Sequence, residues 1–266
     1  MDRVGLFRYE QISKLNESEF AVYNYVFTHL GEMEGMSIRG LSKAAGVSTT
    51  TVLRFCGKMG CEGYTEFKYK VQQFSEKKPR GGYFSPIQSA IGYIQNAIDD
   101  RELEEKIERA ARICLKARQV LFFGIGASGG LGEFGARIFC SVGITAFSMT
   151  DPFYPSPARE MDDTVLFVLS VSGETPMVVT LVDNSKKKKM KIISITNIEQ
   201  CTIARLSELN FTYYMPFTYA YQEDDQMNMT TQVPVLFLLE LLSCKIHDLR
   251  EAEERGAEEK DLSIFS

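Results

Sequence analysis

The stretch "TVLFVLSVSGETP", residues 164–176, predicts a buried β-strand that runs into the start of a helix. Its first seven residues are almost all apolar or β-branched, which is typical of a strand covered on both faces in a parallel sheet. Thr175 is typical of a helix N-cap and Pro176 of the first helical position. Between strand and helix lies a loop with three hydroxyl side chains around one glycine: Ser170, Ser172, Gly173 and Thr175. The stretch therefore predicts an α/β fold with a hydroxyl-rich loop at a helix N-terminus.

Strands and helices alternate on both sides of this stretch. Further strands are predicted at 119–124, 144–149, 191–196 and 210–215. Helices are predicted between the strands at 129–142, 175–189 and 202–208, before them at 86–98 and 101–117, and after them at 229–252. Such alternation is typical of a parallel sheet. The sequence therefore predicts a five-stranded parallel sheet flanked by helices.

A second glycine-rich loop, "FFGIGASGG" at residues 122–130, satisfies the dinucleotide-binding pattern G-x-G-x-x-G. Backbone N–H groups gathered at a helix N-terminus suit any phosphate, so this pattern alone leaves the ligand open. A nicotinamide enzyme would need an acidic residue at the end of the next strand. Asp151 lies 22 residues after Gly129, but it follows "FSMT" and precedes Pro152, which disfavours the nicotinamide assignment.

The two loops are expected to lie together. The carboxyl ends of parallel strands meet at one edge of a sheet, where open α/β folds bind their ligands. Ser128 of the first loop would then join the hydroxyls of the second loop, and the set suits a phosphate carried on a polyhydroxylated body. The alternative is that the hydroxyls only cap the two helices. Capping needs one hydroxyl for each helix, whereas the second loop alone supplies three.

The first 77 residues carry only helix-like patterns, at 16–30, 37–45, 48–59 and 64–75. Within them, "SIRGLSKAAGVSTTTVLRFCGKMG" at residues 37–60 predicts a helix, a tight turn and a second helix. Ser37 and Ser48 are typical N-caps, and Gly46 is expected to end the first helix. Apolar residues fall on one side of the second helix, at Val52, Phe55 and Met59. An all-α helix-turn-helix domain is therefore predicted.

The other side of the second helix has the chemistry of a DNA-reading face, with Ser48, Thr49, Thr50, Arg54 and Lys58. Short hydroxyl side chains at a helix N-terminus contact phosphates or base edges in the major groove, and an arginine pairs with guanine or phosphate. Lys58, one turn after Arg54, suits the DNA backbone. The alternative is an ordinary helical hairpin with a solvated polar face.

Charge is divided unevenly along the chain. The 266 residues carry a net charge of −5, which argues against a general nucleic-acid binder. Residues 1–78 hold 11 Lys and Arg against 9 Asp and Glu, a balance of +2, and the remainder holds 19 against 26, a balance of −7. Only the N-terminal part therefore suits a polyanion such as DNA.

The stretch "EKKPRGGYFSP", residues 76–86, interrupts the helical patterns with charges, prolines and glycines. It predicts a linker at 78–85 between a DNA-binding domain at 1–77 and an α/β domain at 86–256, which is followed by a frayed acidic tail at 257–266. No apolar run reaches the ~20 residues of a membrane span, and the N-terminus lacks a signal-peptide pattern. We therefore expect a cytoplasmic protein with no membrane partner.

The helix-turn-helix segment resembles the N-terminal domain of RpiR-type bacterial transcription regulators. The matching residues are Ala45-Gly46-Val47-Ser48, Arg54-Phe55, Lys58-Met59-Gly60 and Gly63-Tyr64-x-Glu66-Phe67-Lys68. Ser42 and Thr50 stand where that family usually has alanine, and Thr50 bears on which base is read. The resemblance implies a double-stranded DNA operator as partner. It also implies a homodimer or a higher homo-oligomer, because helix-turn-helix proteins present two recognition helices to half-sites ~34 Å apart.

The paired motifs G-x-G-x-S and S-x-S-G-x-T resemble the SIS (sugar isomerase) domain over about residues 85–250. This resemblance implies that hydroxyls of the second motif hold the phosphate of a phosphosugar and that the serine of the first loop adds to the pocket. The binding residues it implies are Gly126, Ser128, Ser170, Ser172, Gly173 and Thr175. The two resemblances together imply a transcriptional regulator of sugar metabolism that senses a phosphosugar effector.

SIS domains also occur in isomerases and etherases, and isomerisation needs a base such as Glu or His over the sugar carbons. The two histidines, His29 and His247, fall outside the motifs and are expected at packing or surface positions, while the roles of Glu174 and Glu240 stay open. The six cysteines are scattered with no C-x-x-C pair, so we expect reduced thiols. We expect no enzyme activity, no catalytic residue, no cofactor and no metal. A phosphosugar isomerase or etherase with an accessory helical domain is the alternative.

Overall fold

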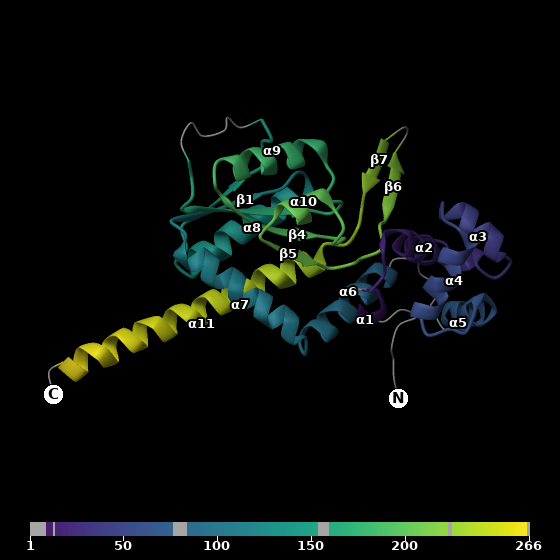
Figure 1. The fold of residues 1–266 in the computed structure, drawn as a ribbon, viewed down its shortest axis with the longest axis horizontal. Helices are drawn as coiled ribbons and strands as arrows, with labels where there is room; N and C mark the ends of the chain where they lie inside the picture. The colour runs from purple at the N-terminus through teal and green to yellow at the C-terminus, as the bar shows by residue number, and fades with distance from the viewer. Residues whose placement is uncertain (1–8, 13, 77–83, 154–159, 223–224, 265–266) are drawn as a thin grey trace. The chain divides into compact units, whose positions relative to one another are not determined.

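The computed structural model describes residues 9–12, 14–76, 84–153, 160–222 and 225–264. These residues form two compact units, which we call the helical unit and the sheet unit (Figure 1). The helical unit holds the described residues up to Asp99 together with Tyr214–Thr231, and the sheet unit holds Asp100–Tyr213 together with the described residues from Gln232 onward. Most of the predicted linker at 78–85 lies outside the described residues.

The first part of the helical unit is all helix, which confirms the predicted helix-turn-helix architecture. Its elements are α1 (Tyr9–Ile12), α2 (Glu17–Thr28), the 3₁₀ turn η1 (Leu30–Glu32), α3 (Ile38–Ala44), α4 (Thr49–Lys58), α5 (Tyr64–Glu76) and α6 (Phe84–Ala97). Gly46 lies in the turn between α3 and α4 with a φ of +67°, a conformation that side chains with a Cβ rarely adopt. Leu41, Val52 and Phe55 are fully buried, and Phe55 packs edge-on against Phe67 with ring centroids 5.3 Å apart.

A hairpin that sequence patterns did not indicate completes the helical unit. Strands β6 (Tyr219–Gln222) and β7 (Asp225–Asn228) pair antiparallel. The chain leading into them packs on α2. The centroid of the Phe20 ring lies 6.2 Å from those of both Tyr214 and Phe217, and Phe217 N–H donates a hydrogen bond to Asn24 Oδ1. The predicted boundaries at 1–77 and 86–256 divide the chain once, at a single linker. Such a division cannot describe a segment that leaves the sheet unit, joins the helical unit and then returns.

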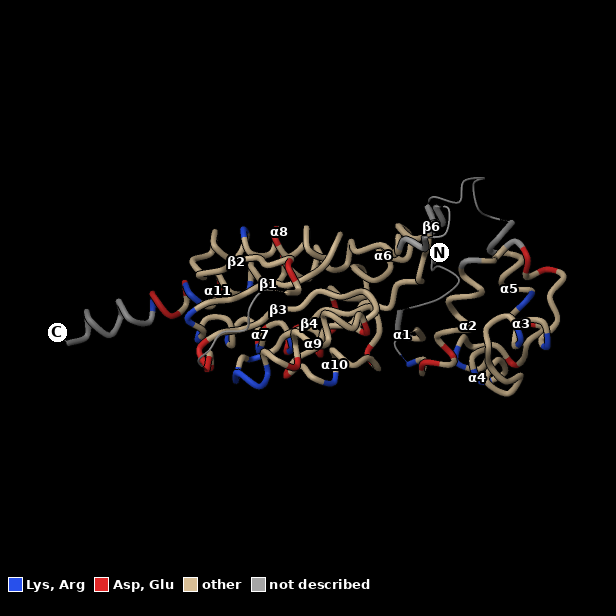
Figure 2. Tube along the Cα trace, turned by 90° about the horizontal axis from the view of Figure 1, so that it is seen from above, with Lys and Arg blue, Asp and Glu red and all other residues tan. Residues whose placement is uncertain are grey.

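The sheet unit is built on five parallel strands in the order β2-β1-β3-β4-β5. The strands are β1 (Gln119–Phe123), β2 (Ala146–Met149), β3 (Thr164–Ser170), β4 (Lys191–Thr196) and β5 (Leu209–Thr212). Every residue of β3 is buried, as its continuous apolar pattern predicts. Apart from Lys191, no residue of these five strands is charged, and Figure 2 shows the charges mainly along the helices. The predicted five-stranded parallel sheet is confirmed.

Helices cover both faces of this sheet (Figure 1). They are α7 (Arg101–Lys116), α8 (Ala127–Ser141), α9 (Pro176–Lys187), α10 (Thr202–Leu206) and α11 (Val233–Ile264). Helices α7, α8 and α11 pack together on one side, and α9 and α10 pack on the other. Phe122 stacks on Phe167 and meets Phe139 of α8 edge-on. The ring centroids are 5.0 Å apart in each pair.

Helix α11 is longer than its pattern indicated. We predicted a helix at 229–252 and a frayed tail at 257–266, but the helix continues to Ile264. The stretch after Arg250 is rich in Glu and also holds Ala, Arg and Lys, whose helix propensity outweighs the single Gly256. None of the helices in the described parts of the chain combines the length and the apolar character that a membrane span requires.

Candidate functional site

The two motif loops follow neighbouring strands. Strand β1 lies between β2 and β3, and Phe123 of β1 is in register with Val168 of β3. Neighbouring strands lie about 4.8 Å apart, so the loops that leave the carboxyl ends of β1 and β3 start side by side. The chain turns from β1 toward β2 on one side and resumes with β3 on the other, and ligands of open α/β sheets bind at such a switch in strand order.

The hydroxyls of the second loop are held by the loop's own backbone. Ser170 Oγ accepts a hydrogen bond from Gly173 N–H at 3.2 Å, and Ser172 Oγ accepts one from Glu174 N–H at 3.2 Å. Ser172 Oγ also lies 3.5 Å from Thr175 Oγ1. A hydroxyl oxygen that accepts a hydrogen bond keeps its own O–H as a donor. The loop therefore orients its serines and still offers O–H groups to an anion.

Helix capping does not account for these hydroxyls. Thr175 is the N-cap residue of α9 and Pro176 its first helical residue, as predicted, but the Thr175 side chain makes no capping hydrogen bond. The N-cap of α8 is Gly126, which has no side chain to offer. The capping alternative thus lacks the contacts that it requires at both helices.

The first loop contributes one buried hydroxyl. Ser128 is 6% exposed, and its Oγ donates to Gln232 Oε1 at 2.9 Å. Gln232 directly precedes α11, and sequence reasoning missed it because 104 residues separate it from Ser128. The sequence offered one weak signal, a polar residue in front of an apolar helix. The N-terminus of α11 is therefore joined to that of α8 beside the candidate site.

Gly173 is required by its surroundings. Its φ is +65°, and a Cβ at this position would overlap Cys201 Sγ. Glu174, which follows, reaches across to the next helix, where its Oε1 accepts a hydrogen bond from Thr202 N–H at 2.6 Å. This contact places the Glu174 carboxylate at the start of α10.

The other acid–base candidates make contacts of their own. His29 Nδ1 lies 3.0 Å from the Tyr25 carbonyl oxygen, and its ring stacks on Tyr25. His247 Nε2 lies 3.3 Å from Glu251, about 22 Å along α11 from Gln232. Glu240 is exposed.

Asp151 Oδ1 accepts a hydrogen bond from Phe153 N–H in a local turn. Within the described ranges, no three His, Cys, Asp or Glu side chains gather closely enough to hold a metal ion.

The candidate DNA-reading helix is α4. Thr49, Thr50 and Arg54 are exposed, whereas Val52 and Phe55 on the other side are fully buried. Ser48 is the N-cap, and its Oγ accepts a hydrogen bond from Thr51 N–H at 3.1 Å, so the oxygen of this hydroxyl caps α4. Leu53 is 49% exposed between Thr50 and Arg54, a position that sequence reasoning did not single out.

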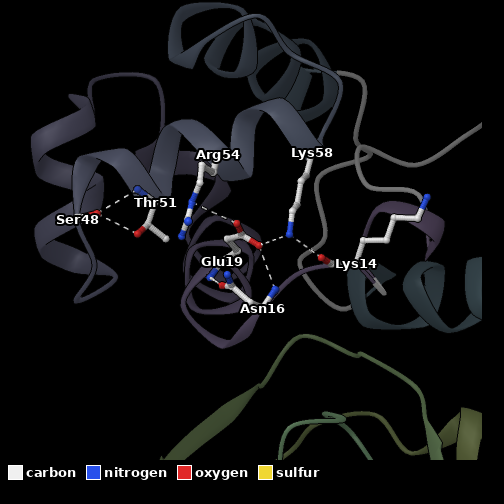
Figure 3. A network of polar contacts seen from close by, with 7 residues as sticks. All are labelled: Lys14, Asn16, Glu19, Ser48, Thr51, Arg54 and Lys58. Atoms are coloured by element: carbon white, nitrogen blue, oxygen red, sulfur yellow. Dashed lines mark hydrogen bonds and ion pairs between the residues drawn. The ribbon is translucent and has the colours of Figure 1, made fainter.

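A buried carboxylate lies behind the exposed face of α4 (Figure 3). Glu19 of α2 has a side chain only 2% exposed, and its carboxylate lies 3.6 Å from Arg54 Nε. The Lys58 ammonium donates to Glu19 Oε2 at 2.5 Å and to the Lys14 carbonyl oxygen at 2.7 Å. Lys58, which the sequence assigned to the DNA backbone, is therefore engaged inside the helical unit. The pattern Asn16-x-x-Glu19 is a capping box and was the available signal for Glu19.

Glu19 should make the stability of the protein depend on acid pH. Burial raises the pKa of its carboxyl, but the contacts to Lys58, to Asn16 N–H and to Arg54 outweigh burial, and the pKa is lowered from its ordinary value of 4.5. The stabilisation is therefore complete above pH 4.5 and is lost as the pH falls below it. We expect the melting temperature of Glu19→Gln to fall less between pH 6 and pH 3.5 than that of the wild type. Equal falls in the melting temperatures of the two proteins over this pH range would contradict the expectation.

Comparison with known proteins matches both parts of the chain. The family described as "Helix-turn-helix domain, rpiR family" matches residues 9–78, and the SIS domain matches residues 114–243. The chain is 28% identical over 211 residues to the uncharacterized HTH-type transcriptional regulator YbbH of Bacillus subtilis, with 74% of each chain covered. It is 24% identical over 261 residues to the HTH-type transcriptional regulator GlvR of the same organism, with 94% of this chain and 97% of GlvR covered.

A solved structure shares the fold over the whole chain. The Vibrio vulnificus NanR protein, determined in complex with ManNAc-6P, aligns with a TM-score of 0.54 at 20% identity. The alignment covers 96% of this chain and 95% of that chain. The likeness in fold thus includes both the helical part and the sheet part of this chain.

Proposed function

Because the chain belongs to the RpiR family of transcriptional regulators, which join a helix-turn-helix domain to a SIS domain, we propose that it binds an operator in double-stranded DNA and senses a phosphosugar effector. Helix α4 reads the operator through Thr49, Thr50 and Arg54. The effector's phosphate binds between the loops that follow β1 and β3. The protein acts on DNA and therefore works in the cytoplasm.

One observation supports the effector site more than any other. The hydroxyls of Ser170, Ser172 and Thr175 lie where the strand order switches, and they do not serve as helix caps. Serine O–H groups together with the N-termini of α8 and α9 complement a phosphate, because both present donors and partial positive charge. Ser128 and the Gln232 amide extend the site toward the sugar. Gly126 and Gly173 shape the two turns, with φ values of +61° and +65°.

The regulator acts as a homodimer that presents two α4 helices to two half-sites. The effector changes operator affinity because it binds one of two conformations of the regulator more tightly than the other. The coupling free energy between two such sites is typically ~1–3 kcal/mol. The chain offers a route for this coupling. It leaves the sheet unit after Tyr213, contributes Tyr214–Thr231 to the helical unit, and returns at Gln232, which accepts the hydrogen bond from Ser128.

We expect a phosphosugar to raise the melting temperature of the full-length protein by several degrees, because a ligand present at many times its Kd stabilises the folded state. A thermal-shift screen over phosphorylated hexoses, pentoses and amino sugars, including ManNAc-6P, tests this. The unphosphorylated sugars serve as controls. A panel without any shift would refute the effector site.

A phosphosugar isomerase or etherase remains the competing assignment. Glu174 Oε1 accepts a hydrogen bond from Thr202 N–H, and neither histidine belongs to a motif loop, which favours a sensor over an isomerase. We therefore propose that the protein is not an enzyme. Incubation of the purified protein with each ligand from the thermal-shift screen tests this, and turnover of any of them would favour the enzyme.

A further inference from the structure

The Glu19 carboxylate is held rigidly at the contact between α2 and α4. It accepts a hydrogen bond from Asn16 N–H at 3.0 Å and another from the Lys58 ammonium, both through Oε2 (Figure 3). The other oxygen, Oε1, faces Arg54 Nε at 3.6 Å. A carboxylate that is 2% exposed and bonded in this way has little freedom to move.

Arg54 approaches this carboxylate by one edge of its guanidinium group. The ion pair is made at Nε, and the side chain is 59% exposed. A guanidinium group carries five N–H donors in a planar fork, and its two Nη groups form the outer end. The ion pair therefore turns the Nε edge toward Glu19 and leaves the Nη end for a forked contact with guanine, the commonest specific contact of arginine in the major groove.

Lys58 completes the arrangement by balancing charge. One carboxylate and two cations meet here, so Lys58 offsets the charge of Glu19. Without Lys58, the buried carboxylate would compete with DNA for Arg54. With Lys58 in place, the contact at Nε orients Arg54, and the guanidinium group keeps its positive charge for the DNA.

We propose that Glu19 is a positioning residue for sequence recognition, which holds the Arg54 guanidinium by its Nε edge so that the Nη fork is presented to a base. This inference rests on the proposed function and extends it. Lys58 is then the partner of Glu19 inside the helical unit.

The test compares operator DNA with scrambled DNA. An operator is first selected from a random DNA library with the wild-type protein, and both affinities are then measured for Glu19→Gln. Operator affinity should fall while affinity for scrambled DNA holds or rises, because a negative charge has been removed near the DNA. We expect the ratio of the two affinities to fall about tenfold. A purely structural defect would lower both affinities together and would overturn the proposal.

A second genetic background and a charge control distinguish positioning of Arg54 from a general effect of the substitution. In Arg54→Lys, which keeps the charge but lacks the fork, Glu19→Gln should change the ratio by less than about twofold, because coupled residues do not act additively. An equal loss in both backgrounds contradicts the proposal. Glu17→Gln, an exposed acid on the same helix, removes the same charge and should leave the ratio unchanged. If Glu19→Gln fails to fold, Glu19→Asp takes its place, since it keeps the charge and withdraws the contact.

A measurement without DNA separates this inference from the proposed function. In NMR spectra of the wild-type chain, Arg54 Nε–H should exchange with water more slowly than that of Arg39, which is exposed on α3. The protection should disappear in Glu19→Gln. Equal exchange at the two arginines in the wild type would overturn the role of Glu19. Failure of the wild type to select any operator would instead overturn the proposed function.

Discussion

Arg54→Ala is expected to weaken operator binding by about thirtyfold to twenty-thousandfold. One good arginine contact to a base is worth ~1–3 kcal/mol, and the proposed dimer loses it at both half-sites, ~2–6 kcal/mol in all. Arg54 lies in the middle of α4 with its side chain 59% exposed, on the face opposite the buried Val52 and Phe55. Fluorescence anisotropy titrations of a labelled operator at fixed salt measure the loss.

The control for this variant carries the same change in charge. Arg137→Ala removes an exposed arginine from α8 of the sheet unit and should leave operator affinity nearly unchanged. Phosphosugar binding should persist in Arg54→Ala, because its site belongs to the sheet unit. Unaltered operator binding by Arg54→Ala would mean that α4 is not the reading helix. A salt series adds detail, since each lost phosphate contact lowers the slope of log affinity against log salt by ~0.9.

Ser172→Ala is expected to weaken phosphosugar binding by ~1.5–3 kcal/mol, the value of a hydrogen bond to a charged group. This is about a tenfold to 150-fold rise in Kd. The Ser172 oxygen is oriented by Glu174 N–H at 3.2 Å, and its O–H can turn from Thr175 Oγ1, 3.5 Å away, to the phosphate. Isothermal calorimetry with the ligand found by thermal shift measures the effect.

Ser141→Ala is the matched control for this second variant. Ser141 ends α8, about 20 Å along the helix from Ser128, and its Oγ bonds only to the Arg137 carbonyl oxygen among the contacts described. Its loss should leave phosphosugar affinity unchanged. Operator binding without effector should be normal in both serine variants. Wild-type affinity in Ser172→Ala would count against the site between the loops after β1 and β3.

The regular elements followed closely from sequence. Strands β3 and β4 occupy the residues predicted for them, and α4 begins directly after its predicted N-cap, Ser48. These features depend on neighbouring residues, because apolar runs, N-caps and turn glycines act within a few positions along the chain. Even the adjacency of the two motif loops was predictable, since parallel strands bring their carboxyl ends to one edge.

Other features depend on residues that are far apart in the chain. Propensity did not reveal that Tyr214–Thr231 packs with α2, because the aromatic residues involved suit either unit. The engagement of Lys58 by Glu19 was equally hidden, since a lysine on an exposed helix face has the same pattern whether it meets solvent, DNA or a buried carboxylate.

The sequence by itself determined the two kinds of architecture, the helix-turn-helix boundaries and the hydroxyl-bearing loops at the strand ends. Only the tertiary structure decided which residues the polar side chains contact: Ser128 contacts Gln232, Glu174 contacts Thr202, and Glu19 contacts Arg54 and Lys58. The physical reason is range. Backbone preferences and helix caps act locally, whereas a side-chain hydrogen bond to a residue 28 to 104 positions away forms only after packing has brought the two elements together.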